Sequence, residues 1–188
     1  MSEKYSVSPN GEKFPLPKPE DYKSEFEAIK KRVKLERAKG REIVVVMGVG
    51  FVGAVMAAIV ADTVDKKGKP SKFVIGMQRP SARSFWKIPM LNRGVSPVKA
   101  EDPEVDPMIA RCVKDKKTLM ATYTYDVLKL ADVVVVDVQC DYIKEELGNV
   151  RAGQTDMAAL EASLAVIAQH IPSEALLLIK TTVAPGTT

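Results

Sequence analysis

A strand, a glycine turn and a helix follow one another without interruption over residues 42–61. The first part, Ile43–Met47, is apolar and rich in β-branched residues, which is typical of a buried strand. The second part is apolar from Phe51 onwards and long enough for a buried helix. Between them the glycines give the spacing G-x-G-x-x-G, at Gly48, Gly50 and Gly53. This context makes the glycine spacing far more specific than it would be elsewhere in a chain.

Each glycine has a mechanical task in such a turn. Gly48 permits the tight turn off the strand, Gly50 lets the backbone approach a pyrophosphate, and Gly53 lets the helix pack closely on the strand. Phe51 and Val52 open the helix, whose free N–H groups and positive dipole end would face the phosphates. The run therefore predicts a dinucleotide-binding loop.

Composition narrows the class of protein. With 188 residues, 46% of them hydrophobic and a net charge of +4, the chain fits one globular domain plus an appendage. The basic residues are dispersed, so we expect no nucleic-acid partner. We also expect no membrane span and no signal peptide, because no apolar run is long enough. Cys112 and Cys140 make neither a disulfide framework nor a metal site, and a reducing, cytoplasmic location is the natural expectation.

The chain divides near Gly40. Residues 1–18 are polar and proline-rich, which predicts an extended arm. Residues 20–39 predict an amphipathic helix, with one apolar stripe formed by Tyr22, Phe26, Ile29 and Val33. The stripe could pack on its own domain, which we favour, or on a second subunit. A homo-oligomer therefore stays one alternative.

After Gly40 strands and helices alternate, so residues 41–188 predict one α/β domain. Strands are expected at 42–47, 72–77, 118–122, 133–138 and 175–180, and helices at 51–64, 103–114, 125–130 and 156–171. This alternation predicts a doubly wound, Rossmann-like parallel sheet with right-handed connections. Ligands of such sheets bind outside the carboxyl ends of the strands, so the loops that follow the five strands should line the site.

The residues of those loops resemble a known family. The strings are Gly48-Val-Gly-Phe-Val-Gly53, Leu91-Asn-Arg-Gly-Val-Ser-Pro97, Ala121-Thr122, Ala131-Asp-Val-Val-Val-Val136 and Lys180-Thr-Thr-Val-Ala-Pro-Gly-Thr-Thr188. In this order they are similar to the NAD-binding domain of the UDP-glucose/GDP-mannose dehydrogenase family, the nucleotide-sugar 6-dehydrogenases. The resemblance covers residues 41–188, and the first forty residues lie outside it.

The resemblance implies an NAD-dependent double oxidation, in which the C6 alcohol of a nucleotide-linked sugar becomes a carboxylate for polysaccharide biosynthesis. In the family, the catalytic cysteine, glutamate, lysine and asparagine lie after the string that ends here at Thr188. We therefore expect no catalytic residue in this sequence. The expected organisation is a cofactor domain truncated before the family's central and C-terminal domains, through which the NDP-sugar substrate would bind.

The resemblance also assigns the cofactor contacts along the five loops. The expected cofactor-binding residues are Gly48, Gly50, Phe51, Val52, Gly53, Gln78, Arg83, Val138, Cys140, Thr181, Thr182 and Val183. Gln78 stands where the family has an acidic residue for the adenosine ribose, so NADP stays open beside NAD. Asp137 interrupts an apolar strand near its end. It could meet the nicotinamide side or pair with a neighbouring loop, which we favour.

Two alternatives remain open at this stage. The first is the cofactor domain of another NAD(P)-dependent dehydrogenase, of the hydroxyacid or 6-phosphogluconate type. The string Leu91–Pro97 argues against it. The second is a non-catalytic dinucleotide-binding module.

Overall fold

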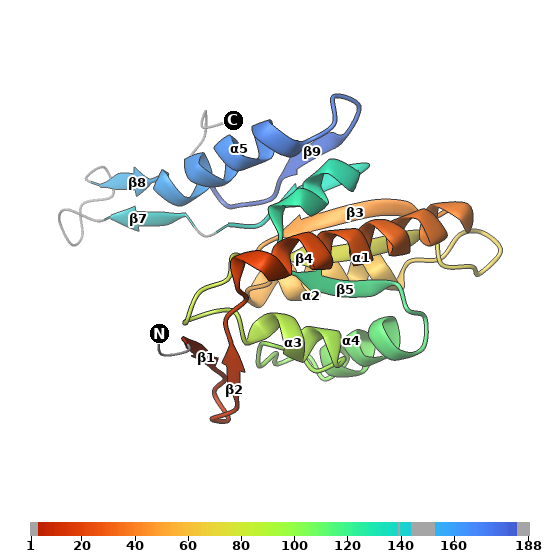
Figure 1. Cartoon of the computed structure of the whole chain (residues 1–188), viewed down its shortest axis with the longest axis horizontal. Helices are drawn as coiled ribbons and strands as arrows, with labels where there is room; N and C mark the ends of the chain where they lie inside the picture. Colours follow the sequence, from red (N-terminus) through yellow and green to blue (C-terminus); the bar gives the residue numbers. More distant parts are fainter. Residues whose placement is uncertain (1–3, 139, 144–152, 184–188) are drawn as a thin grey trace.

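The computed structural model describes residues 4–138, 140–143 and 153–183. Five parallel strands form its central sheet in the spatial order β5-β4-β3-β6-β9 (Figure 1). Their bounds are Glu42–Met47 for β3, Lys72–Met77 for β4, Leu119–Thr122 for β5, Val133–Val136 for β6 and Leu176–Ile179 for β9. The doubly wound parallel sheet expected from the sequence is confirmed.

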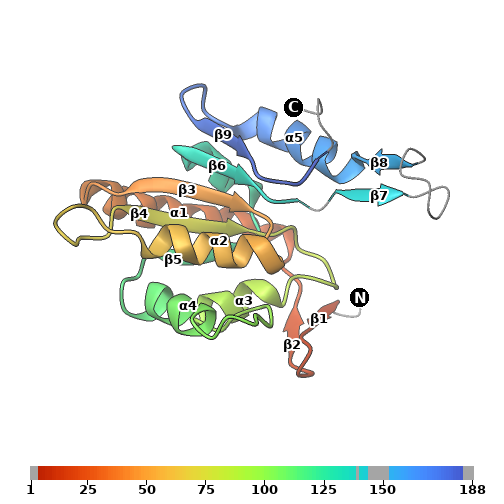
Figure 2. The same cartoon turned by 180° about the vertical axis from the view of Figure 1, so that it is seen from behind.

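Helices cover both faces of this sheet. One face carries α1 (Pro19–Ala38), the 3₁₀ helix η1 (Tyr125–Leu130) and α5 (Ala158–His170). The other carries α2 (Phe51–Asp62), α3 (Lys87–Asn92) and α4 (Val105–Lys114). Figure 1 shows α1 lying across the first face, and Figure 2 shows α2 across the opposite one.

Strand β3 explains why the sequence shows an unbroken apolar run. Its side chains alternate between the two faces. Val44 and Val46 enter the core with α2 and α4, whereas Ile43, Val45 and Met47 enter the core with α1 and η1. All five side chains are buried, so neither face tolerates a polar residue.

The stripe of α1 packs on the chain's own sheet, which is the alternative that we favoured. Ile29 and Val33 are buried in the same core as Ile43 and Val45. Tyr22 contacts the ring of Tyr123 edge to face, with the ring centroids 5.0 Å apart.

The segment predicted as an extended arm contains a β-hairpin instead. Strand β1 (Tyr5–Val7) pairs antiparallel with β2 (Lys13–Pro15). The hairpin is held by tertiary contacts: Ser6 Oγ accepts the backbone N–H of Trp86 at 3.0 Å, and the Arg93 guanidinium lies over the ring of Phe14, 5.3 Å from its centroid. Strands this short have too little side-chain alternation to be recognised locally.

Other elements differ from expectation at their ends. Strand β6 ends at Val136, where its partner strands also end, so Asp137 and Val138 lie in a loop rather than in the predicted strand. Helix α3 was not predicted. A second hairpin, β7 (Asp141–Ile143) with β8 (Gln154–Asp156), was not predicted either.

The outer edge of the sheet at β5 is closed by a side chain. Asn92, from the string Leu91–Pro97, donates its amide N–H to the carbonyl oxygen of Ala121 at 2.9 Å. Its side-chain oxygen accepts the N–H of Ala121 at 2.6 Å. The amide of Asn92 therefore occupies the hydrogen-bonding groups that a further strand would need at this residue.

We expect Gly53→Ala to lower the free energy of unfolding by more than about 2 kcal/mol, because its Cβ would lie 1.8 Å from the carbonyl oxygen of Gly48. Gly50→Ala is the matched control. A Cβ there meets no atom within 4 Å, so a change under about 1 kcal/mol is expected. Urea denaturation of both variants measures the difference, and equal stabilities would contradict the close packing of α2.

Candidate dinucleotide-binding site

The glycine loop has the geometry that its spacing predicts. Gly48 has a φ of +97°, and a Cβ there would lie 2.3 Å from the carbonyl oxygen of Asp137. Gly53 is buried at the contact between α2 and the loop. At Gly50, by contrast, an added Cβ would meet no atom within 4 Å, so this position is open to the space outside the loop. The first intrahelical bond of α2 runs from Ala54 N–H to Gly50, so the amides of Phe51 and Val52 have no partner within the helix and can meet an anion.

A cavity of about 710 Å³ lies beside this loop at the carboxyl ends of the strands. Its volume falls in the range of small-molecule and cofactor sites. From the predicted set it is lined by Gly48, Gly50, Phe51, Val52, Gln78, Val138, Cys140, Thr181 and Thr182. The structure thus brings together residues of four predicted loops that are distant in the sequence.

Three predicted residues do not line this cavity. Gly53 faces the protein interior, Arg83 is exposed on the loop after β4, and Val183 packs against the core on the α5 side. Their contact with a cofactor stays a prediction.

Part of the wall was missed by sequence reasoning. Residues Tyr125, Ala159, Ala162, Ser163 and Val166 also line the cavity. Tyr125 lies shortly after the carboxyl end of β5. Since ligands of such sheets bind at the carboxyl ends of the strands, this residue could have been predicted. The four residues of α5 carry no local signal, because their position depends on how that helix packs across the sheet.

Gln78 ties two loops of the site together. Its side-chain oxygen accepts the backbone N–H of Val49, inside the glycine loop, at 3.1 Å. Its amide nitrogen lies 3.5 Å from Ser84 Oγ, and its backbone N–H donates to Thr122 at 3.0 Å. Gln78 therefore serves the protein's own backbone, in addition to facing the cavity.

Thr181 performs the same task at the opposite end of the cavity. Its hydroxyl oxygen accepts the N–H of Val138 at 3.1 Å and lies 2.8 Å from the Val138 carbonyl oxygen, to which it donates. The end of β9 is thereby fixed to the loop after β6. These two hydrogen bonds are a sufficient structural reason for a threonine at position 181, even without a ligand. The neighbouring Thr182 also lines the cavity.

Asp137 places a carboxylate in the wall of the cavity. The backbone of Gly53 hydrogen-bonds to it, and Lys180 is close enough for its charge to act on it. Burial nevertheless raises the pKa of Asp137 above its ordinary value, against the opposing effects of Lys180 and Gly53. Pairing with a neighbouring loop is therefore present, as we favoured, while Asp137 is also one of the residues that line the cavity.

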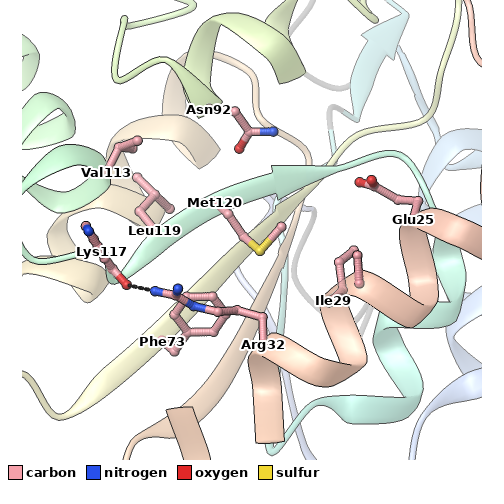
Figure 3. A pocket seen from close by; sticks show the side chains of 10 residues that line it. Glu25, Ile29, Arg32, Phe73, Asn92, Val113, Lys117, Leu119 and Met120 are labelled. Carbon is pink, nitrogen blue, oxygen red and sulfur yellow. Dashed lines mark hydrogen bonds between the residues drawn. The ribbon is translucent and has the colours of Figure 1, made fainter. Parts of the chain in front are cut away.

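A second cavity, of about 390 Å³, lies between α1 and the outer strand β5 (Figure 3). Arg32 lies over the ring of Phe73 and donates to the carbonyl oxygen of Lys117 at 3.0 Å. Glu25 accepts the hydroxyl of Thr122 at 2.8 Å. Since these polar groups, like Asn92, already bond to the protein, the candidate site is the cavity at the strand ends.

The described residues contain no group of His, Cys, Asp and Glu side chains that could hold a metal ion. Within the same residues, every helix is too short or too polar to cross a membrane.

Comparison with known proteins identifies relatives of this arrangement. Residues 42–188 match the family model described as the UDP-glucose/GDP-mannose dehydrogenase family, NAD binding domain. A solved NDP-N-acetyl-D-galactosaminuronic acid dehydrogenase from Methanosarcina mazei Go1 is 29% identical, with a TM-score of 0.65, over 82% of this chain and 30% of its own. A UDP-D-ManNAc dehydrogenase from Pyrococcus horikoshii is 27% identical, with a TM-score of 0.58, over 78% of this chain and 30% of its own.

A GDP-mannose dehydrogenase from Pseudomonas aeruginosa shares the fold at 23% identity and a TM-score of 0.58, over 77% of this chain and 29% of its own. No curated protein sequence matches this chain. The chain spans about 30% of the length of the first two solved relatives.

We expect Gly50→Val to abolish dinucleotide binding while leaving the fold stable. The position is open, so a valine side chain fits the protein but projects into the space beside the helix N-terminus. Backbone bonds to phosphate, each about 1.5–3 kcal/mol, would be lost. Calorimetric titration with NAD measures the effect, and unchanged affinity would mean that the loop is only a packing turn.

We expect Asp137→Asn to strengthen NAD binding several-fold at pH 7. The amide keeps an oxygen for Gly53 but removes a negative charge from a cavity that must accept a pyrophosphate. Because the pKa of Asp137 is raised, acidification neutralises its carboxylate earlier than an ordinary one. The affinity of the unaltered chain should then rise as pH falls, and that of the variant should stay flat.

Titrations at several pH values test this expectation. Glu101→Gln, at an exposed residue outside the cavity, is the control for a change of net charge. Parallel pH profiles of the unaltered chain and Asp137→Asn would contradict the role given to the carboxylate.

Proposed function

The chain belongs to the UDP-glucose/GDP-mannose dehydrogenase family, and we propose that it holds NAD for the oxidation of a nucleotide-linked sugar at C6, from alcohol to carboxylate. The observation that carries the proposal is the cavity at the strand ends, where the open Gly50 and the N-terminus of α2 meet loops from three other strands. Bound NAD would supply the hydride acceptor for this oxidation.

The residues of the chain bind and orient the cofactor. The N-terminal amides of α2 receive the pyrophosphate, since a helix N-terminus offers both free donors and a positive dipole end. Gln78 holds the loop at the adenosine end and Thr181 holds the loop at the nicotinamide end. The exposed side chains of Phe51 and Val52 stand at the mouth of the cavity, where they would exclude water from the bound cofactor.

The substrate class follows from the relatives, as part of the same proposal. Two solved relatives above 25% identity are named for N-acetylated sugars linked to a nucleotide. A nucleotide-linked N-acetylhexosamine is therefore the first substrate to test. The sugar would bind through parts of a longer protein, which would also supply the nucleophilic cysteine.

The experiment measures binding and turnover separately. We expect the 188-residue chain to bind NAD in calorimetric titration and to lack binding as Gly50→Val. We expect no NADH, measured by its absorbance, when the chain and NAD are mixed with UDP-glucose, GDP-mannose or UDP-N-acetylhexosamines. Covalent catalysis needs a nucleophile with a positioned base, which the family resemblance assigns to residues beyond the matched strings.

The two measurements contradict different parts of the proposal. Absence of binding to any nicotinamide dinucleotide would overturn the cofactor role. NADH formation by the 188-residue chain alone would contradict the proposal that this chain binds the cofactor while the catalytic residues lie outside it.

A further inference from the structure

The end of β4 carries an amide where a carboxylate discriminates between cofactors. In dinucleotide sites of this fold, an acidic residue at this place accepts bonds from the ribose hydroxyls and repels a 2′-phosphate. Here the strand ends at Met77 and is followed by Gln78, which is neutral. Repulsion of a 2′-phosphate by this side chain is therefore absent.

Gln78 is also a weaker partner for the ribose than a carboxylate would be. Its side-chain oxygen, the only acceptor of the amide group, already receives the N–H of Val49 at 3.1 Å. That oxygen has a second lone pair, so a ribose hydroxyl can still donate to it, but without the charge assistance that a carboxylate gives. Gln78 therefore gives a free 2′-hydroxyl only a weak preference and does not repel a 2′-phosphate.

Three cations follow Gln78, two in the loop after β4 and one at the first residue of α3. Arg79 lines the cavity, Arg83 is exposed, and Lys87 is half-buried one helical turn beyond Arg83. Within the described part of the chain, none of the three forms an ion pair with a carboxylate. The pKa of Lys87 is lowered by burial first and by the charge of Arg83 second, and its ammonium lies over the ring of Trp86, 5.9 Å from the centroid.

The loop that carries these cations is fixed in place. Ser84 Oγ donates to the carbonyl oxygen of Arg79 at 3.1 Å and bonds to Ser81 Oγ at 2.7 Å. Trp86 donates its indole N–H to the carbonyl oxygen of Arg83 at 3.0 Å, and its backbone N–H to Ser6 of the N-terminal hairpin. An anion would therefore meet charges on an ordered backbone, and less entropy is lost on binding.

We propose that Arg79, which lines this cavity, binds a 2′-phosphate at its adenosine end, with Arg83 adding positive charge from outside the wall, so that the chain binds NADP at least as tightly as NAD. This inference rests on the proposed function, because it places the adenosine beside the loop after β4. Guanidinium groups bind phosphate in a bidentate manner, and Arg79, which has no ion pair among the described residues, gives the phosphate a partner that replaces its water.

The experiment titrates the 188-residue chain with NAD and with NADP by calorimetry. We expect an NADP dissociation constant equal to or below that of NAD. Arg79→Gln should weaken NADP about tenfold and NAD less than about twofold. Lys67→Gln, in the exposed turn between α2 and β4, removes the same charge away from the cavity and should change neither.

A second variant tests the strand end directly. Gln78→Glu has the same length and keeps an acceptor for Val49, but it restores a negative charge. It should tighten NAD and weaken NADP about tenfold.

The outcomes separate this inference from the proposed function. Tighter binding of NAD than NADP by the unaltered chain overturns the inference and leaves the proposed function standing. So does an Arg79→Gln variant that weakens both dinucleotides alike or neither. Absence of binding to both dinucleotides overturns the inference and the proposed function together.

Discussion

Helix α2 approaches the ends of β3 and β6 more closely than any side chain would allow. A Cβ at Gly53 would lie 1.8 Å from the carbonyl oxygen of Gly48, and a Cβ at Gly48 would lie 2.3 Å from that of Asp137. This approach brings the N-terminus of α2 to the carboxyl edge of the sheet. The cavity, the position of Gln78 beside Val49 and the contact of Asp137 with Gly53 all depend on it.

The sheet and its glycine loop could be predicted because their signals are local. The apolar run of β3 reflects burial on both faces, and the spacing of the three glycines reflects contacts within a few residues. The two hairpins could not be predicted, since strands of three residues carry too little local pattern, and the first hairpin is held by distant contacts such as Ser6 with Trp86. The residues of α5 that line the cavity could not be predicted from the sequence either, because their position depends on how the helix packs on the sheet.

The residues before the family match are part of the same folded body. Ile29 and Val33 of α1 share a core with strands β3 and β4, and the hairpin β1–β2 contacts α3 and the loop that follows β4. A segment outside the matched range thereby supports one end of the candidate site. Gln78 shows the converse, because a residue predicted to contact the ribose has a structural bond that only the three-dimensional arrangement reveals.

The amide of Asn92 makes the two sides of the sheet unequal. At β5 it fills the outward hydrogen-bonding groups of Ala121, so a foreign strand cannot add there without displacing it. At β9, the other outermost strand, Leu176, Leu177 and Leu178 are exposed in the described structure. Unwanted strand addition and aggregation of this chain should therefore begin at β9, where polar substitutions would improve the behaviour of the protein at high concentration.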